Sequence, residues 1–152
     1  MNTILTIKTI YVANYISGTV SVIDRSTNTV ITTITVGGGG STLSTIEFNP
    51  SNNNMYVTNS ASSAVSVIDS STNTVIETIP VDNSPTAIEY NPSNDNIYTI
   101  SANFNAITII DSSTNIVVKT VQAGTHTVAI EYNPSNDNIC GKSGITVRHN
   151  NR

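Results

Sequence analysis

The sequence predicts an all-β protein made of consecutive antiparallel sheets, and both its composition and its residue pattern lead to this fold class. Val, Ile and Thr supply 59 of the 152 residues, whereas Leu and Ala together supply 10. Branched side chains suit the pleated surface of a strand, and long helices need the residues that are scarce here. Between turn signals, polar and apolar residues alternate with a period of two, as in half-buried strands. A helical bundle and an α/β fold are therefore excluded.

An internal repeat organises the whole chain. Pro50, Pro92 and Pro134 lie 42 residues apart, and each stands in the sequence Asn-Pro-Ser-Asn. The interval between the first and second repeats is three residues longer, and the additional residues fall within residues 37–41. This Gly-rich segment is either a native loop insertion or an engineered linker. A fixed period of this length is typical of repeat architectures.

Each repeat contains four predicted strands. In the second repeat they span residues 45–49, 55–59, 64–69 and 74–81, and in the third 86–91, 96–102, 106–111 and 116–123. Asn-Pro-Ser-Asn and Asp-Ser-Ser-Thr-Asn form the turns, because Pro presets φ and Asn tolerates the left-handed conformation. Four short strands in about 42 residues are typical of a propeller blade. We therefore expect a partial β-propeller of about three four-stranded antiparallel blades, with strands of blade 1 at 9–36, blade 2 at 44–81, blade 3 at 86–123 and a partial blade at 127–149.

Both faces of each sheet carry apolar residues, so we expect burial on both faces. Three blades are fewer than the four to eight from which propellers are built. We expect an open arc rather than a closed ring, although residues 127–133 could complete the first blade. Such an arc would expose apolar residues such as Val20, Val22 and Ile109 at its end faces. The chain is therefore expected to self-associate or to be part of a longer propeller.

Three aspartates recur in the same turn of successive repeats. Asp24, Asp69 and Asp111 are each followed by Asn four residues later. The spacing lacks the alternating oxygen ligands and the terminal Glu of a calcium-binding EF-hand loop. Asp side chains that accept hydrogen bonds from their own turn explain the pattern. We interpret them as turn residues.

Charge and composition exclude several function classes. The net charge is −4 and only six residues are Lys or Arg, so the chain lacks the clustered positive charge needed to bind nucleic acid. No apolar run approaches the length of a membrane span. The one cysteine, Cys140, cannot form an internal disulfide and is expected to be a small core residue. His126 and His149 are interpreted as solvated loop residues, and the alternative for His126 is a general base or metal ligand at the loop face. No nucleophile with a base and an orienting group can be assembled.

Three glutamates stand at equivalent positions of successive first strands. Glu47, Glu89 and Glu131 are 42 residues apart, and the first strand of a propeller blade lines the central channel. Neighbouring carboxylates raise each other's pKa unless a cation or water lies between them. The main interpretation is an acidic, solvated channel. The alternative is a Ca²⁺ or Mg²⁺ site formed by these three residues, and no other cofactor is expected.

The predicted binding surface is a set of loops at one rim. Alternate connections of four-stranded blades emerge on the same side, which places residues 59–63, 82–84, 103–105 and 124–126 together. The residues expected to contact a partner are Asn59, Ser60, Asp82, Asn83, Asn103, Asn105, Thr125 and His126.

The repeats resemble a known family. The second repeat contains Tyr-Val-Thr-Asn at residues 56–59, Val-Ser-Val-Ile-Asp at 65–69 and Thr-Asn-Thr-Val at 72–75. The first repeat copies these sequences closely, and the third keeps Asp111 but has the weaker copy Tyr-Thr-Ile-Ser at 98–101. This pattern is similar to the YVTN β-propeller repeat of archaeal surface-layer proteins and related bacterial proteins. The resemblance implies a propeller fold and an extracellular or cell-surface setting, and the family has no single shared activity.

Two functional hypotheses follow. The first is a noncatalytic extracellular module of a surface-layer type of protein, acting as a structural scaffold or binding protein or glycan partners at the loop rim. It rests on the low charge, the 63 Ser, Thr and Asn residues and the family resemblance. The alternative is a fragment of a propeller enzyme, of lyase or dehydrogenase type, with a cation or cofactor in the channel. That alternative requires titratable groups that converge on one face.

Overall fold

The computed structural model describes residues 9–37, 42–82, 84–124 and 127–143 as thirteen strands joined by turns. The strands are β1 Thr9–Asn14, β2 Thr19–Asp24, β3 Thr29–Thr35, β4 Leu43–Asn49, β5 Asn54–Asn59, β6 Ala64–Asp69, β7 Thr74–Pro80, β8 Pro85–Asn91, β9 Asn96–Ser101, β10 Ala106–Asp111, β11 Ile116–Gln122, β12 Thr127–Asn133 and β13 Asn138–Ser143.

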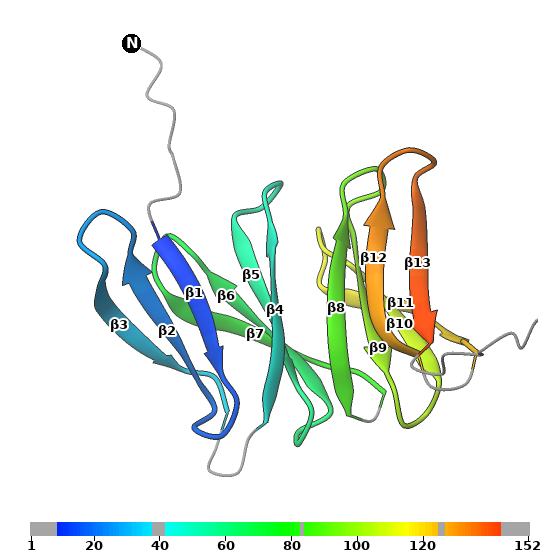
Figure 1. Ribbon diagram of the computed structural model, residues 1–152, viewed down its shortest axis with the longest axis horizontal. Helices are drawn as coiled ribbons and strands as arrows, with labels where there is room; N and C mark the ends of the chain where they lie inside the picture. Colours follow the sequence, from blue (N-terminus) through cyan, green and yellow to red (C-terminus); the bar gives the residue numbers. More distant parts are fainter. Residues whose placement is uncertain (1–8, 38–41, 83, 125–126, 144–152) are drawn as a thin grey trace, which may run out of the picture.

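The strands form four antiparallel sheets in chain order. The first sheet is β1-β2-β3, the second β4-β5-β6-β7, the third β8-β9-β10-β11 and the last β12-β13. Figure 1 shows the sheets side by side, with each strand running opposite to the one before it. The predicted fold class is confirmed, because the described residues are all-β and the four-stranded sheets are consistent with propeller blades.

The blade boundaries differ slightly from the predicted ones. The first sheet spans residues 9–35, the second 43–80 and the third 85–122, so each bound lies within one residue of the expected range. The last sheet ends at Ser143, and residues 144–149 of the predicted partial blade lie outside the described residues. Each outermost strand β3, β7 and β11 contains a bulge that leaves Ile31, Ile76 or Val118 without a partner on the neighbouring strand.

Neighbouring sheets meet through apolar faces, and the innermost strands lie next to one another. β4 contacts β1 on one side and β8 on the other, and β8 in turn contacts β12. One core cluster lies between the first and second sheets, where Val20 and Val22 pack with Val57 and Ile68. The predicted burial of both sheet faces is thus confirmed for the second sheet, because Val65 and Val67 pack toward the third sheet instead.

The prediction that Val20 and Val22 are exposed on the end face of the first sheet is wrong. Val20 and Val22 are fully buried, because this face of the first sheet packs against the second sheet. The opposite face of the first sheet is the exposed one, and it carries Ile10 and Val12. The alternation of side chains was predicted correctly, but the direction in which each sheet meets its successor was not.

Aspartate and asparagine stabilise the turns that join β2 to β3, β6 to β7 and β10 to β11, as predicted. A carboxylate oxygen of Asp69 accepts the Ser71 N–H at 2.7 Å, and that of Asp111 accepts the Ser113 N–H at 2.8 Å. The Ser71 hydroxyl and N–H lower the pKa of Asp69. Asn73 adopts a φ of 56°, the left-handed region that Asn tolerates better than most residues. These interactions account for the repeated aspartates without a metal ion.

In the described part of the chain, there is no helix that could span a membrane.

Candidate functional site

The connection rim is the edge formed by the loops at residues 15–18, 60–63 and 102–105 and by the described residues that link one sheet to the next. Figure 1 shows these loops along the lower edge of the molecule. Backbone hydrogen bonds join the two kinds of connection. The Leu43 N–H donates to the Tyr15 carbonyl at 3.3 Å, the Ser60 N–H to the Thr42 carbonyl at 2.9 Å and the Val81 N–H to the Ser63 carbonyl at 3.0 Å. The rim therefore presents loops whose backbone is held in place by the sheets.

The predicted contact residues have different environments at this rim. Asn59 is only 2% exposed, and its side-chain oxygen accepts the Ser62 N–H at 3.3 Å, so it shapes the loop rather than meeting a partner. Ser60 is half-buried. Its hydroxyl group forms a hydrogen bond with the Ser44 hydroxyl and donates to the Pro85 carbonyl at 2.6 Å. Asn59 is therefore corrected from a partner contact to a structural residue, whereas the contact role of Ser60 stays a prediction.

The other predicted contact residues lie at the surface or outside the described residues. Asp82 and Asn103 are exposed, whereas Asn105 is half-buried and has a φ of 52°. Asn83, Thr125 and His126 lie outside the described residues, as does His149.

Three large side chains at the same rim were missed by the sequence analysis. Tyr15 is 59% exposed, Ile16 83% and Phe104 51%. The second sheet has Ala61 and Ser62 in the corresponding loop. Apolar residues inside a turn were a usable signal, because they stand where the repeat otherwise has small polar residues. Exposed aromatic side chains are enriched in protein interfaces.

The three glutamates form a row across neighbouring inner strands. Glu47 is on β4, Glu89 on β8 and Glu131 on β12. A carboxylate oxygen of Glu89 accepts the backbone N–H of Tyr132 at 3.1 Å, so this side chain joins β8 to β12. Glu47 and Glu89 are half-buried, whereas Glu131 is exposed.

Burial and mutual repulsion alter the titration of the two half-buried glutamates. Burial raises the pKa of Glu47 from its ordinary value of 4.5 to about 7, and the neighbouring Glu89 carboxylate adds to the increase. Burial also raises the pKa of Glu89, but the hydrogen bond from the Tyr132 N–H opposes this effect. With a pKa of about 7, the Glu47 carboxyl group is partly protonated near neutral pH.

The predicted Ca²⁺ or Mg²⁺ site is not formed by these residues. Among the residues that the structure describes, no three His, Cys, Asp or Glu side chains are placed to hold a metal ion together. The physical reason lies in the row itself. Glu89 is bonded to the backbone of the next strand, and Glu131 faces solvent at the far end, so the three carboxylates do not converge.

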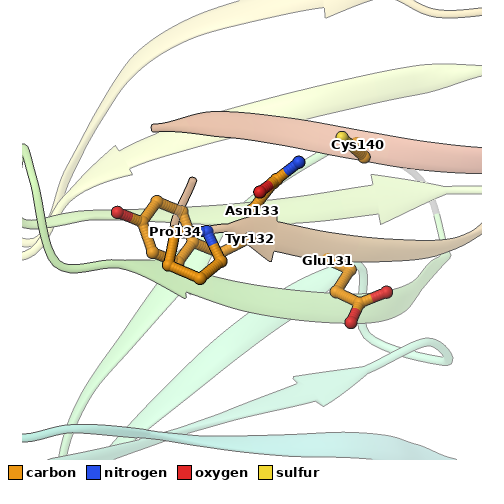
Figure 2. Close-up of a pocket in the computed structure, with 5 residues that line it drawn as sticks. All are labelled: Glu131, Tyr132, Asn133, Pro134 and Cys140. Atoms are coloured by element: carbon orange, nitrogen blue, oxygen red, sulfur yellow. The ribbon is translucent and has the colours of Figure 1, made fainter. Parts of the chain in front are cut away.

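Two cavities lie on the β12-β13 hairpin, and they share Glu131 and Cys140, which are opposite each other across the two strands. Figure 2 shows the first, of about 220 Å³, which is lined by Glu131, Tyr132, Asn133, Pro134 and Cys140. The second, of about 190 Å³, is lined by Ala129, Ile130, Glu131, Cys140 and Gly141.

Cys140 is an exposed free thiol, so its expected position in the core is wrong. It occupies the repeat position of Tyr56 and Tyr98, on the strand face directed away from the preceding sheet. In the described part of the chain, no further sheet follows to bury that face.

The raised pKa of Glu47 predicts a stability that falls with increasing pH. Between about pH 4.5 and pH 7 the folded chain keeps a proton that the unfolded chain releases, so the free energy of unfolding decreases over this window. We expect a loss of about 1–2 kcal/mol, less than the full shift implies because water screens a half-buried carboxyl. Urea denaturation at pH 5 and pH 8 measures it.

The neutral variant Glu47→Gln should remove most of this pH dependence and be more stable than wild type at pH 8. Glu131→Gln is the matched control, because it changes an exposed glutamate of the same row and should retain the decrease. A Glu47→Gln chain with the wild-type pH profile would contradict the assignment.

Comparison with known proteins adds to the description of the fold. No family model and no curated protein matches the sequence. Among solved structures, the chain is similar to hydrazine synthase of Kuenenia stuttgartiensis, with a TM-score of 0.78 and 24% sequence identity over 84% of this chain. The match covers 36% of that protein's chain, so the present chain spans about a third of its length.

The sheets, their repeat and this similarity define the chain as an all-β repeat protein with a propeller-like fold. At 24% identity the similarity concerns the fold alone.

Proposed function

We propose that the chain is a noncatalytic β-propeller module that binds a protein or glycan partner through the connection rim. The observation that carries this proposal is the exposure of Tyr15, Ile16 and Phe104 on loops held by the sheets. Large rigid side chains give contact area at low entropic cost, and stable loops limit the ordering that binding requires.

The composition and the repeat support an extracellular or cell-surface setting for this module. Ser, Thr and Asn supply 63 residues, and only 11% of the chain is charged. The Tyr-Val-Thr-Asn sequence of residues 56–59 also resembles the YVTN repeat of surface-layer proteins. We propose that the chain acts there as a scaffold whose connection rim meets the partner.

The test applies the labelled chain to an array of glycans and, in parallel, to an array of purified cell-envelope proteins. We expect Tyr15→Ser/Ile16→Ser and Phe104→Ser to weaken a positive signal by about tenfold or more, because exposed aromatic anchors dominate binding energy. Ile31→Ser is the matched control, since Ile31 is 54% exposed but lies on β3 outside the rim. Unchanged signals with both rim variants would refute the assignment of this surface.

The raised pKa of Glu47 favours the alternative hypothesis of a propeller enzyme fragment. A carboxyl group with a pKa of about 7 has the protonation behaviour of a general acid or base. Thermal-shift measurements with Mg²⁺, Ca²⁺, haem and a quinone cofactor distinguish the hypotheses. Tight binding that Glu47→Gln abolishes would favour the enzyme.

A further inference from the structure

In the part of the chain that the structure describes, the first sheet has three strands and no strand pairs with its inner edge. In the second and third sheets, the strand equivalent to β1 pairs with an inner strand, β4 with β5 and β8 with β9. Among the described residues, β1 pairs with β2 only. An open strand edge offers a row of unpaired backbone groups to another strand.

The face of the first sheet that points away from the second sheet is also exposed. Ile10 is 44% exposed and Val12 39%, whereas their counterparts Met55 and Val57 in the second sheet are 8% and 0% exposed. The preceding sheet accounts for this difference, because Met55 and Val57 pack in one cluster with Val20 and Val22. In the second sheet, the equivalent face is covered by another sheet of the same repeat, so a sheet of this kind fits the exposed face of the first sheet.

At the other end of the molecule, the inner strand β12 pairs with β13, whose sequence departs from that of the equivalent strands β5 and β9. β12 has the sequence Thr-Val-Ala-Ile-Glu-Tyr-Asn, which closely matches β8, Pro-Thr-Ala-Ile-Glu-Tyr-Asn. Its neighbour β13 has Cys140 and Gly141 where β5 has Tyr56 and Val57. Gly within a strand weakens it. β1, in contrast, keeps Tyr-Val at the corresponding positions, so β1 is the better-matched partner for β12.

We propose that two copies of the chain associate head to tail, with β12 of each copy becoming the inner strand of the other copy's first sheet. The completed sheet has the order β12-β1-β2-β3, and β1 takes the place that β13 occupies beside β12. Each chain keeps its second and third sheets, and the exchange completes the first sheet of each copy, so the pair contains six four-stranded sheets. Six lies within the range of four to eight blades of closed propellers, whereas the three sheets of a single closed chain do not.

The proposed ring also supplies partners for residues at both ends. It places the third sheet of one copy against Ile10 and Val12 of the other, as the second sheet now packs against the third. Tyr98 gains a counterpart as well. Tyr56 donates to Asn115 on the next sheet at 2.8 Å, and the equivalent residue facing Tyr98 in the ring is Asn28, which has the same left-handed backbone.

Light scattering and native mass spectrometry test the association, and neither depends on the proposed partner of the connection rim. We expect twice the chain mass of 16.1 kDa, with dissociation on dilution. Ile10→Asp should yield folded monomer. Ile76→Asp is the matched control, because Ile76 is 52% exposed on β7 outside the contact, and it should stay dimeric. A monomer at every concentration, or an open series of larger species, would overturn the proposal.

A cysteine pair tests the strand exchange itself. Ala87 lies opposite Ile100 in the third sheet, and the equivalent positions in the exchanged pair are Ala129 and Ala13. In a Cys140→Ser background, Ala13→Cys/Ala129→Cys should give a disulfide-linked dimer on a non-reducing gel, because residues directly opposite are close enough to link. Ala129→Cys alone should not. A disulfide within one chain, or none despite dimer formation, would rule out the exchange between copies.

Discussion

We expect Tyr56→Ala to lower the free energy of unfolding by about 3–5 kcal/mol, the cost of removing a large buried aromatic side chain. Tyr56 is fully buried between the second and third sheets. Its hydroxyl donates to Asn115 at 2.8 Å and accepts a hydrogen bond from Asn52 at 3.1 Å. The substitution therefore removes packing and a link between two sheets at once. Urea denaturation followed by circular dichroism measures the change.

Two further variants separate the hydroxyl from the ring. Tyr56→Phe should cost about 1–2 kcal/mol, because it removes only the hydrogen bonds. Tyr11 makes the same link to the turn of the second sheet, donating to Asn73 at 2.8 Å, but it is half-buried, so Tyr11→Phe should cost less. Tyr15→Ala is the exposed control and should be nearly neutral. If Tyr56→Phe were as stable as wild type, the link between sheets would contribute nothing.

Ile68→Ala should destabilise the chain by about 2–5 kcal/mol, the range observed when a fully buried aliphatic side chain is truncated. Ile68 has no exposed surface and packs with Val20 and Val22 across the boundary between the first and second sheets. The loss therefore weakens the contact between two sheets rather than one sheet alone. Thermal and urea unfolding should both show a single transition at lower stability.

Ile23→Ala is the matched control for this substitution. Ile23 holds the same position in the first sheet, where it is half-buried because none of the described sheets packs on that face. At low protein concentration Ile23→Ala should cost about 1 kcal/mol or less, in keeping with its smaller buried area. Equal losses for the two variants at all concentrations would contradict the described packing.

The fold was predictable because its determinants are local. Turn residues such as Pro50, Asp69 and Asn73 fix hairpins within a few residues of themselves, and the alternation of Val65, Val67 and Ile68 assigns the two faces of a strand. The end faces were not predictable in the same way. Val20 and Val12 lie on opposite faces of the first sheet. Which face packs on the next sheet depends on how the two sheets are rotated relative to each other, and the alternation of residues along a strand carries no information about that rotation.

The candidate site was predictable only in its location. Connections on one rim follow from strand order, yet Asn59 proved to be structural because it is buried and its side-chain oxygen accepts a hydrogen bond from its own loop. The glutamate row was found by its spacing, but not the hydrogen bond from the Tyr132 N–H that holds Glu89 to the backbone of β12. Because the composition is rich in polar residues, polar side chains were predicted as the partner contacts. The exposed aromatic side chains of Tyr15 and Phe104 were therefore not predicted.

The hydroxyl groups of Tyr11 and Tyr56 link their own sheets to the sheet that follows along the chain. Tyr11 bonds to a turn of the second sheet and Tyr56 to a turn of the third, so these links of the first and second sheets depend on residues that the ribosome adds later. During synthesis from the N-terminus, the hydroxyl of Tyr11 stays without its partner until residue 73 has emerged, and that of Tyr56 until residue 115. We therefore expect the nascent chain to gain protection from proteolysis in steps about one repeat long, each delayed until the following sheet has left the exit tunnel.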